Sequence, residues 1–275
     1  MLEPRRLAKK FEFSGRDFLG RKTKAIFRPS GPRNWMIASN EPTELSPHLL
    51  FLGSSYLVLR RGNGQDPIVI PEHILALRHA VLGVKWYPET GQVPYEGGAK
   101  DFSAGLFAAS EISNDPIPTY TVSRELEHVV EERKFRRVVR IRPHTGECGL
   151  ILQVHVRYSF GEATHVYHVW EDGVFERLVQ SRPLGKPACF RLPLKLFGWP
   201  HYGQVLWAKQ EIDRVGREAV LEEICAHRAL DMLGALSFLC KDGLFVGRVE
   251  SEYGGHSLDV PLVEDAYPLL VPVVS

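Results

Sequence analysis

The segment Glu223-Ile-Cys-Ala-His-Arg-Ala-Leu-Asp231 places a histidine, His227, four residues before an aspartate. The apolar residues around it recur at helical spacing and predict a helix over residues 211–234. Side chains at positions i and i+4 of a helix lie on one face, about one turn apart. An imidazole and a carboxylate placed in this way form half of a metal site, although the same spacing also occurs on solvated or ion-paired helix faces.

A second segment, Asp66-Pro-Ile-Val-Ile-Pro-Glu-His-Ile-Leu-Ala-Leu-Arg-His79, offers further ligands. Its apolar run at 68–70 predicts a short strand, and the following pattern predicts a helix over 71–82, which Pro71 suits as a first-turn residue. Glu72 and His73 then lie at a strand-to-helix junction, where side chains reach a cleft. A glutamate at a helix start is also explained by the positive end of the helix dipole.

The bulk composition is that of a soluble globular protein. The chain has 275 residues, of which 44% are hydrophobic and 24% charged, enough for one or two sizeable cores. A net charge of +1 gives no electrostatic footprint for nucleic acid. No apolar run is long enough for a membrane span, the N-terminus lacks a signal-peptide pattern, and the four cysteines form no Cys-x-x-Cys pair. We therefore expect a cytoplasmic protein with reduced thiols.

A boundary is indicated at Ser113-Asn-Asp-Pro-Ile-Pro-Thr119, where prolines and polar residues interrupt the apolar pattern. We expect two domains, residues 1–115 and 119–275, each a run of strands followed by helices, which is typical of the α+β class. Strands are predicted at 22–27, 35–38, 48–52, 55–60, 68–70, 120–122, 136–141, 150–156, 164–168 and 244–250, and helices at 71–82, 101–109, 211–234 and 236–241.

Three segments together resemble a known family. Glu72-His-Ile-Leu-Ala-Leu77, His227-Arg-Ala-Leu-Asp-Met-Leu-Gly234 and Gly254-Gly-His-Ser-Leu258 occur in the order and at roughly the distances found in UDP-3-O-acyl-N-acetylglucosamine deacetylases. These are the zinc enzymes of lipid A synthesis, and the chain resembles a divergent paralogue of them. Shorter matches are Phe27-Arg-Pro29, Val93-Pro-Tyr-Glu-Gly-Gly-Ala99 and Phe197-Gly198, so the resemblance spans almost the whole chain.

The resemblance implies a fold and a set of roles. The fold is two duplicated domains, each a β-sheet layer packed on helices, with the metal site between the helical layers. The cofactor is Zn²⁺. The implied metal ligands are His73, His227 and Asp231, the implied catalytic residues are the general base Glu72 and the oxyanion-stabilising or proton-donating His256, and the implied substrate-binding residues are Arg228 and Phe197.

The residue types suit this chemistry. Two imidazoles and one carboxylate leave an open position on a tetrahedral zinc, as a hydrolytic metal requires. The same three ligands also suit non-haem iron, but a neighbouring glutamate base and a distal histidine serve hydrolysis. Arg228 stands where the family has a lysine facing the substrate, and its planar fork offers a two-point contact to a phosphate or carboxylate. His256 alone would be read as an ordinary loop histidine.

Departures from the family pattern bear on catalysis. Leu196 stands where the family has a threonine whose hydroxyl helps to hold the oxyanion. Ala235 stands where it has an aspartate that orients the catalytic histidine, so we expect His256 to lack its charge partner and to be protonated less readily. Phe18-Leu-Gly20 stands where the family has His-Ser-Gly in its substrate contacts.

Another departure concerns the acyl chain. The segment between Gln204 and Ala226 has a helical pattern almost throughout, where the family has a strand-helix-strand insert that forms a hydrophobic passage for a fatty acyl group. We therefore expect the passage to be missing or reduced.

The sequence thus predicts a zinc-dependent amide hydrolase of the deacetylase type. Its expected substrate is an N-acyl amino sugar, such as a sugar nucleotide, or a related small N-acyl compound, and no nucleic-acid partner or membrane span is expected. One alternative is a catalytically weak zinc-binding paralogue with a regulatory or scaffold role. Another is an authentic UDP-3-O-acyl-N-acetylglucosamine deacetylase. The oligomeric state is not indicated.

Overall fold

The computed structural model describes residues 4–16, 22–31, 35–37, 43–44, 50–52, 57–59, 68–70, 72–88, 99–132, 135–146, 149–184, 206 and 208–273. The chain belongs to the α+β class. Its first half consists of β1 (Arg5–Leu7), β2 (Phe11–Arg16), β3 (Lys22–Pro29), β4 (Met36–Ile37), β5 (Thr43–Glu44), β6 (Leu50–Leu52), β7 (Leu57–Leu59), β8 (Ile68–Ile70), α1 (Glu72–Leu75), the 3₁₀ helix η2 (Ala76–His79), β9 (Val81–Leu82), β10 (Val84–Pro88), α2 (Lys100–Ala108) and β11 (Ser110–Ile112).

The second half has longer strands and the longest helix of the described residues. It consists of β12 (Thr119–Val122), β13 (Leu126–Glu132), β14 (Phe135–Arg142), β15 (Leu150–Tyr158), β16 (Gly161–His168), α3 (Val174–Gln180), α5 (Ala208–Val215), α6 (Arg217–Leu236), η5 (Ser237–Cys240), β17 (Leu244–Phe245), β18 (Gly247–Glu252), α7 (His256–Ala266), η6 (Tyr267–Leu269) and β19 (Leu270–Pro272). None of the described helices is long and apolar enough to cross a membrane.

Each half contains a five-stranded mixed sheet, and the two sheets are built in the same way. The strand orders are β2-β3-β10-β4-β5 and β13-β14-β18-β15-β16. In both sheets an antiparallel hairpin pairs with a late strand, which pairs in parallel with a second hairpin. The match is therefore one of strand order and of strand direction.

The small sheets repeat as well. In β11-β1-β9 and in β19-β12-β17 the first strand of the half lies in the middle, antiparallel to the last strand and parallel to the strand that follows a helix. The antiparallel sheet β6-β7-β8 belongs to the first half alone among the described strands. In this topology α1 with η2 corresponds to α6 with η5, and α2 corresponds to α7.

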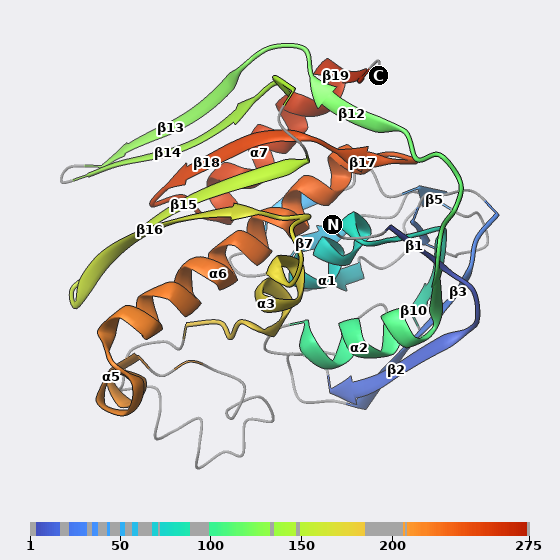
Figure 1. Ribbon diagram of the computed structural model, residues 1–275, viewed down its shortest axis with the longest axis horizontal. Helices are drawn as coiled ribbons and strands as arrows, with labels where there is room; N and C mark the ends of the chain where they lie inside the picture. The colour runs from blue at the N-terminus through green and yellow to red at the C-terminus, as the bar shows by residue number, and fades with distance from the viewer. Residues whose placement is uncertain are drawn as a thin grey trace.

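The central helix α6 joins the two halves. On β15, Leu152, Val154 and Val156 are buried and alternate with more exposed residues, and α6 packs against this strand and β16. From Ala229 onward nearly every residue of α6 is buried, as expected for a helix covered on all sides. The other side of α6 packs against α1 and η2, and Figure 1 shows α6 running from one edge of the molecule to its centre along β15 and β16, with α1 beside it.

Two predicted helices have different bounds from those expected. The helix predicted over 71–82 ends at His79, because Val81 and Leu82 form β9 and pair in parallel with β1. The helix predicted over 211–234 is divided into α5 and α6 at Gly216, whose φ of 92° is a conformation that favours glycine. The helix predicted at 236–241 is the 3₁₀ helix η5.

The placement of His256 on a loop is wrong. His256 is the first residue of α7, a helix that the sequence did not predict. Pro261 lies inside α7, and a proline removes a helical N–H, so it obscures the helical pattern. The strands that were also missed are β1, β2, β5, β10, β11, β13 and β19. Of these, β13 is the partner of β14 in a hairpin with a charged outer face.

Candidate metal and acid–base site

Three predicted ligands come together between α1 and α6. His73 lies on α1, and His227 and Asp231 lie one turn apart on α6. One ligand atom of each residue lies within 4.8 Å of the other two. The imidazole centroids of His73 and His227 are 6.1 Å apart, and Nε2 of His227 is 3.6 Å from Oδ1 of Asp231. Two imidazoles and a carboxylate at these separations could hold one metal ion.

Close contact between α1 and α6 brings these residues together. Gly234 of α6 lies against the backbone of Glu72, and a Cβ at this position would overlap the Glu72 carbonyl group. Seven residues after Glu72, Nε2 of the buried His79 lies 3.1 Å from the carbonyl oxygen of Leu233, the residue before Gly234, to which it can only donate. The lack of a side chain at residue 234 therefore lets α6 approach the start of α1.

A backbone carbonyl orients the imidazole of His227. Its Nδ1 lies 3.3 Å from the carbonyl oxygen of Ser181, which follows α3. Because a carbonyl oxygen only accepts, this contact requires a proton on Nδ1, and in the neutral imidazole Nε2, which faces Asp231, is then the lone-pair nitrogen. Asp231 is buried, which opposes its ionisation, but the attraction of His227 in its protonated form, of His256 and of Arg228 holds its pKa below the ordinary value.

The predicted acid–base pair lies beside the three ligands. Oε2 of Glu72 contacts Nδ1 of His256, at the N-terminal end of α7. Glu72 is 2% exposed, and its Oε1 is buried without a hydrogen-bond partner among the described residues. Burial raises the pKa of the Glu72 carboxyl, and the charge of Glu72 raises the pKa of the His256 imidazole. One oxygen of Glu72 is thus engaged by His256, and the other is available to accept a proton.

The expectation that His256 lacks a charge partner is wrong. Glu72, far away in the sequence, contacts its imidazole directly. A second carboxylate, Asp259, lies one turn after His256 on α7, and one of its oxygens falls within 4.8 Å of one ligand atom of Glu72 and one of His256. Ala235 and Asp259 line the same small cavity of about 10 Å³. The carboxylate of Asp259 on α7 therefore lies beside Ala235, the position on α6 at which the resemblance implied an aspartate.

Arg228 points into this cluster and is paired there. Its Nη1 and Nη2 donate to Oδ2 and Oδ1 of Asp259 at 2.6 and 2.5 Å, and Nη2 lies 3.4 Å from Oγ of Ser251. Both partners of the ion pair are largely buried. The two-point contact that the sequence assigned to a substrate is thus made by Asp259 in this structure.

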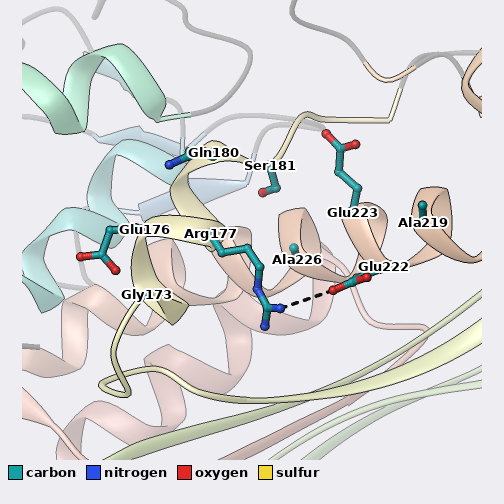
Figure 2. Close-up of a pocket in the computed structure, with 9 residues that line it drawn as sticks. All are labelled: Gly173, Glu176, Arg177, Gln180, Ser181, Ala219, Glu222, Glu223 and Ala226. Carbon is teal, nitrogen blue, oxygen red and sulfur yellow. Dashed lines mark hydrogen bonds and ion pairs between the residues drawn. The ribbon is translucent and has the colours of Figure 1, made fainter. Parts of the chain in front are cut away.

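A cavity of about 390 Å³ lies on the α3 side of α6 (Figure 2). Ser181 and Ala226 form part of its wall. The carbonyl of Ser181 contacts the imidazole of His227, and Ala226 directly precedes His227 in the chain. Figure 2 shows Glu222 turned toward Arg177 of α3 and Glu223 turned to the opposite side. The cavity is lined by Gly173, Glu176, Arg177, Gln180, Ser181, Ala219, Glu222, Glu223 and Ala226.

Several residues singled out from the sequence lie outside the described part of the chain. They are Phe197 with Gly198, the oxyanion position Leu196, the segment 18–20 and residues 93–98 of the Val-Pro turn.

The sequence did not single out Asp259, Ser181 or Glu223. For Asp259, a signal was present in its position three residues after His256, which places the two side chains on one helix face. The contacts of Ser181 and Glu223 join α6 to the segment after α3.

No family model matches the sequence, and no curated protein matches it. The function is therefore inferred from the geometry of the site and from the motifs quoted above.

Proposed function

We propose that this protein is a zinc-dependent amide hydrolase of the deacetylase type, acting on an N-acyl amino sugar or a related small N-acyl compound. The observation that carries the proposal is the meeting of His73, His227 and Asp231 within 4.8 Å of one another. These residues come from two helices separated by more than 140 residues of sequence. Their convergence is what the resemblance to the lipid A deacetylases implies for a metal centre.

The donor set fits zinc. Two neutral imidazoles and a carboxylate are the ligands of many hydrolytic zinc sites, which keep one position open for water or substrate. The Ser181 carbonyl supplies the outer contact that metal-binding histidines usually make. When bound, zinc polarises a carbonyl oxygen and makes water acidic enough to act as a nucleophile near neutral pH.

Glu72 and His256 supply the proton transfers. Oε1 of Glu72, buried and without a hydrogen-bond partner among the described residues, accepts a proton from the attacking water. His256, held by Oε2 of the same carboxylate, carries the positive charge that stabilises a tetrahedral oxyanion or donates a proton to the leaving amine. One carboxylate therefore orients the acid with one oxygen and acts as the base with the other.

The architecture supports the same proposal. The repeated strand order of the two halves is what a duplicated two-domain fold would produce, with the metal residues between the helices that meet at its centre. The described residues from 208 to 226 are helical except at Gly216, so they contribute no strand to an acyl passage. We therefore propose a short acyl group, such as acetyl, as the group removed.

The test uses the purified full-length chain. N-acetylated amino sugars and sugar nucleotides are assayed for deacetylation, and the zinc content of the same samples is measured. We expect turnover with at least one small N-acyl substrate, and we expect Glu72→Gln to keep its zinc and lose turnover. Zinc-loaded protein that is inactive across the panel would favour the regulatory zinc-binding alternative. Wild-type turnover in Glu72→Gln would refute the role of the base.

A further inference from the structure

One peptide unit spans two side chains of α6 that lie a turn apart. The carbonyl oxygen of Ser181 lies 3.3 Å from Nδ1 of His227, and the amide nitrogen of Arg182 donates to Oε1 of Glu223 at 3.2 Å. These two backbone atoms belong to the same peptide group, because the carbonyl carbon of residue 181 is bonded to the nitrogen of residue 182. Glu223 and His227 are thus linked through a single peptide plane.

Arg182 fixes the carboxylate of Glu223 at one end of this link. Nε and Nη2 of Arg182 donate to Oε1 and Oε2 of Glu223 at 2.7 and 2.9 Å, and Nη1 donates to Oε1 of Glu211 at 3.1 Å. Ser181 is 4% exposed, and its hydroxyl donates to the carbonyl oxygen of Leu178 at 2.6 Å. The position of the Ser181–Arg182 peptide is therefore set by α3 on one side and by Glu223 on the other.

The geometry of the peptide lets Glu223, which accepts its N–H, orient the carbonyl that faces His227. A trans peptide is planar, with its N–H and C=O pointing in opposite directions, so fixing one of these groups fixes the other. A carboxylate that accepts the N–H polarises the peptide and strengthens its carbonyl as an acceptor. Metal-binding histidines commonly donate their second nitrogen to a carboxylate or a carbonyl. Here a carboxylate reaches the histidine through a carbonyl.

We propose that Glu223 is a positioning residue for His227, acting through the Ser181–Arg182 peptide to keep the His227 proton on Nδ1 and its Nε2 directed toward the candidate metal site. The inference rests on the proposed function for the identity of the ion at Nε2. The state of the imidazole itself can be measured without any metal.

A purely structural role for Glu223 predicts a different result. In that case the ion pair with Arg182 only ties the segment after α3 to α6, and removing it lowers stability without changing the imidazole. Glu222 is the matched control, because it is the adjacent glutamate on α6, lines the same cavity and pairs with an arginine, Arg177, at 3.4 Å. The structure gives it no contact with the Ser181–Arg182 peptide.

The experiment compares Glu223→Ala, Glu223→Gln and Glu222→Ala in the full-length chain. Nitrogen-15 NMR of histidine-labelled, metal-free protein reports the tautomer of His227, which is assigned by its loss in His227→Ala. We expect the Nδ1–H form in the wild type and in Glu222→Ala, and a mixture of tautomers in Glu223→Ala. Glu223→Gln, which can still accept the peptide N–H but lacks the charge, should be intermediate.

Zinc affinity, measured by competition with a chelator, is the second readout. We expect a loss of about 10-fold to 100-fold in Glu223→Ala, a smaller loss in Glu223→Gln and less than a twofold change in Glu222→Ala. If Glu223→Ala fails to fold, Glu223→Gln decides. An unchanged tautomer together with unchanged affinity in a folded Glu223 variant would overturn the inference. A wild type that binds no zinc would instead remove the proposed function, while the tautomer measurement would still decide the role of Glu223.

Discussion

Gly234 of α6 lies against the backbone carbonyl of Glu72, with no space between them for a side chain. The relationship joins the helix that carries His227 and Asp231 to the helix that starts with Glu72 and His73. The distance between the two pairs of residues, and hence the candidate metal site, depends on this contact.

Gly234→Ala should lower both stability and zinc affinity. On an exposed helix face, a glycine-to-alanine change stabilises the helix by up to about 1 kcal/mol. A net loss of stability in Gly234→Ala would therefore be caused by the clash with Glu72. Gly105→Ala in α2 is the control, because its Cβ would meet the ring of Phe11, on another side of the first half. Denaturant unfolding and chelator competition should show both losses for Gly234→Ala and only the stability loss for Gly105→Ala. Undiminished zinc affinity in folded Gly234→Ala would contradict the role of the contact.

The buried pair of Arg228 and Asp259 should behave as a unit. Removing one partner of a buried ion pair leaves an uncompensated charge and costs about 3–5 kcal/mol. Asp259→Leu and Arg228→Met should each be strongly destabilising, whereas the double variant should lose less than the sum of the two. The free energy of unfolding in urea is measured for the wild type, the two single variants and the double variant, which completes a double-mutant cycle. Additive losses would mean that the two side chains do not interact in solution.

If the enzyme removes a short acyl group, lengthening the acyl chain of the substrate should not raise kcat/KM. Contact with an apolar passage would contribute about 0.8 kcal/mol for each buried methylene. The helix α5 has no buried residue, and no described strand lies between it and His227. We expect kcat/KM not to increase when the acyl group is lengthened well beyond acetyl, and a long-chain hydroxamate to bind little better than acetohydroxamate. A thousandfold tighter long-chain hydroxamate would instead support the authentic lipid A activity.

Stability should decrease in mild acid because of His79. Burial lowers the pKa of His79 to about 4, from 6.5, and its Nε2 faces the Leu233 carbonyl. The unfolded chain binds a proton at a higher pH than the folded chain does, so this contribution is complete above pH 6.5 and is lost as the pH falls toward 4. The expected loss is about 3 kcal/mol.

The matched variant for this effect is His79→Gln, which keeps a donor for the Leu233 carbonyl. Unfolding free energies are measured for both proteins from pH 7.5 to pH 4. The wild-type curve should fall more steeply than that of the variant below pH 6.5. Parallel curves would show that His79 does not cause the acid sensitivity.

Local spacing predicted which side chains come together, because an i, i+4 pair and a helix start determine side-chain positions within one element. The His227–Asp231 and Glu72–His73 pairs are of this kind. Asp259 and Glu223 were missed because their partners come from other elements, and α7 itself was hidden by Pro261. The anionic partner of His256 was missed for the same reason, since Glu72 reaches it only after α1 and α7 have packed around α6.

The central claim is that His73, His227 and Asp231 bind one metal ion, and metal analysis of purified protein tests it most directly. We expect about one zinc per chain in the wild type, and almost none in the double variant His227→Ala, Asp231→Ala. The control is the double variant His168→Ala, Glu171→Ala, which removes an exposed histidine–carboxylate pair and should keep its zinc. Full zinc occupancy after loss of His227 and Asp231 would contradict the account.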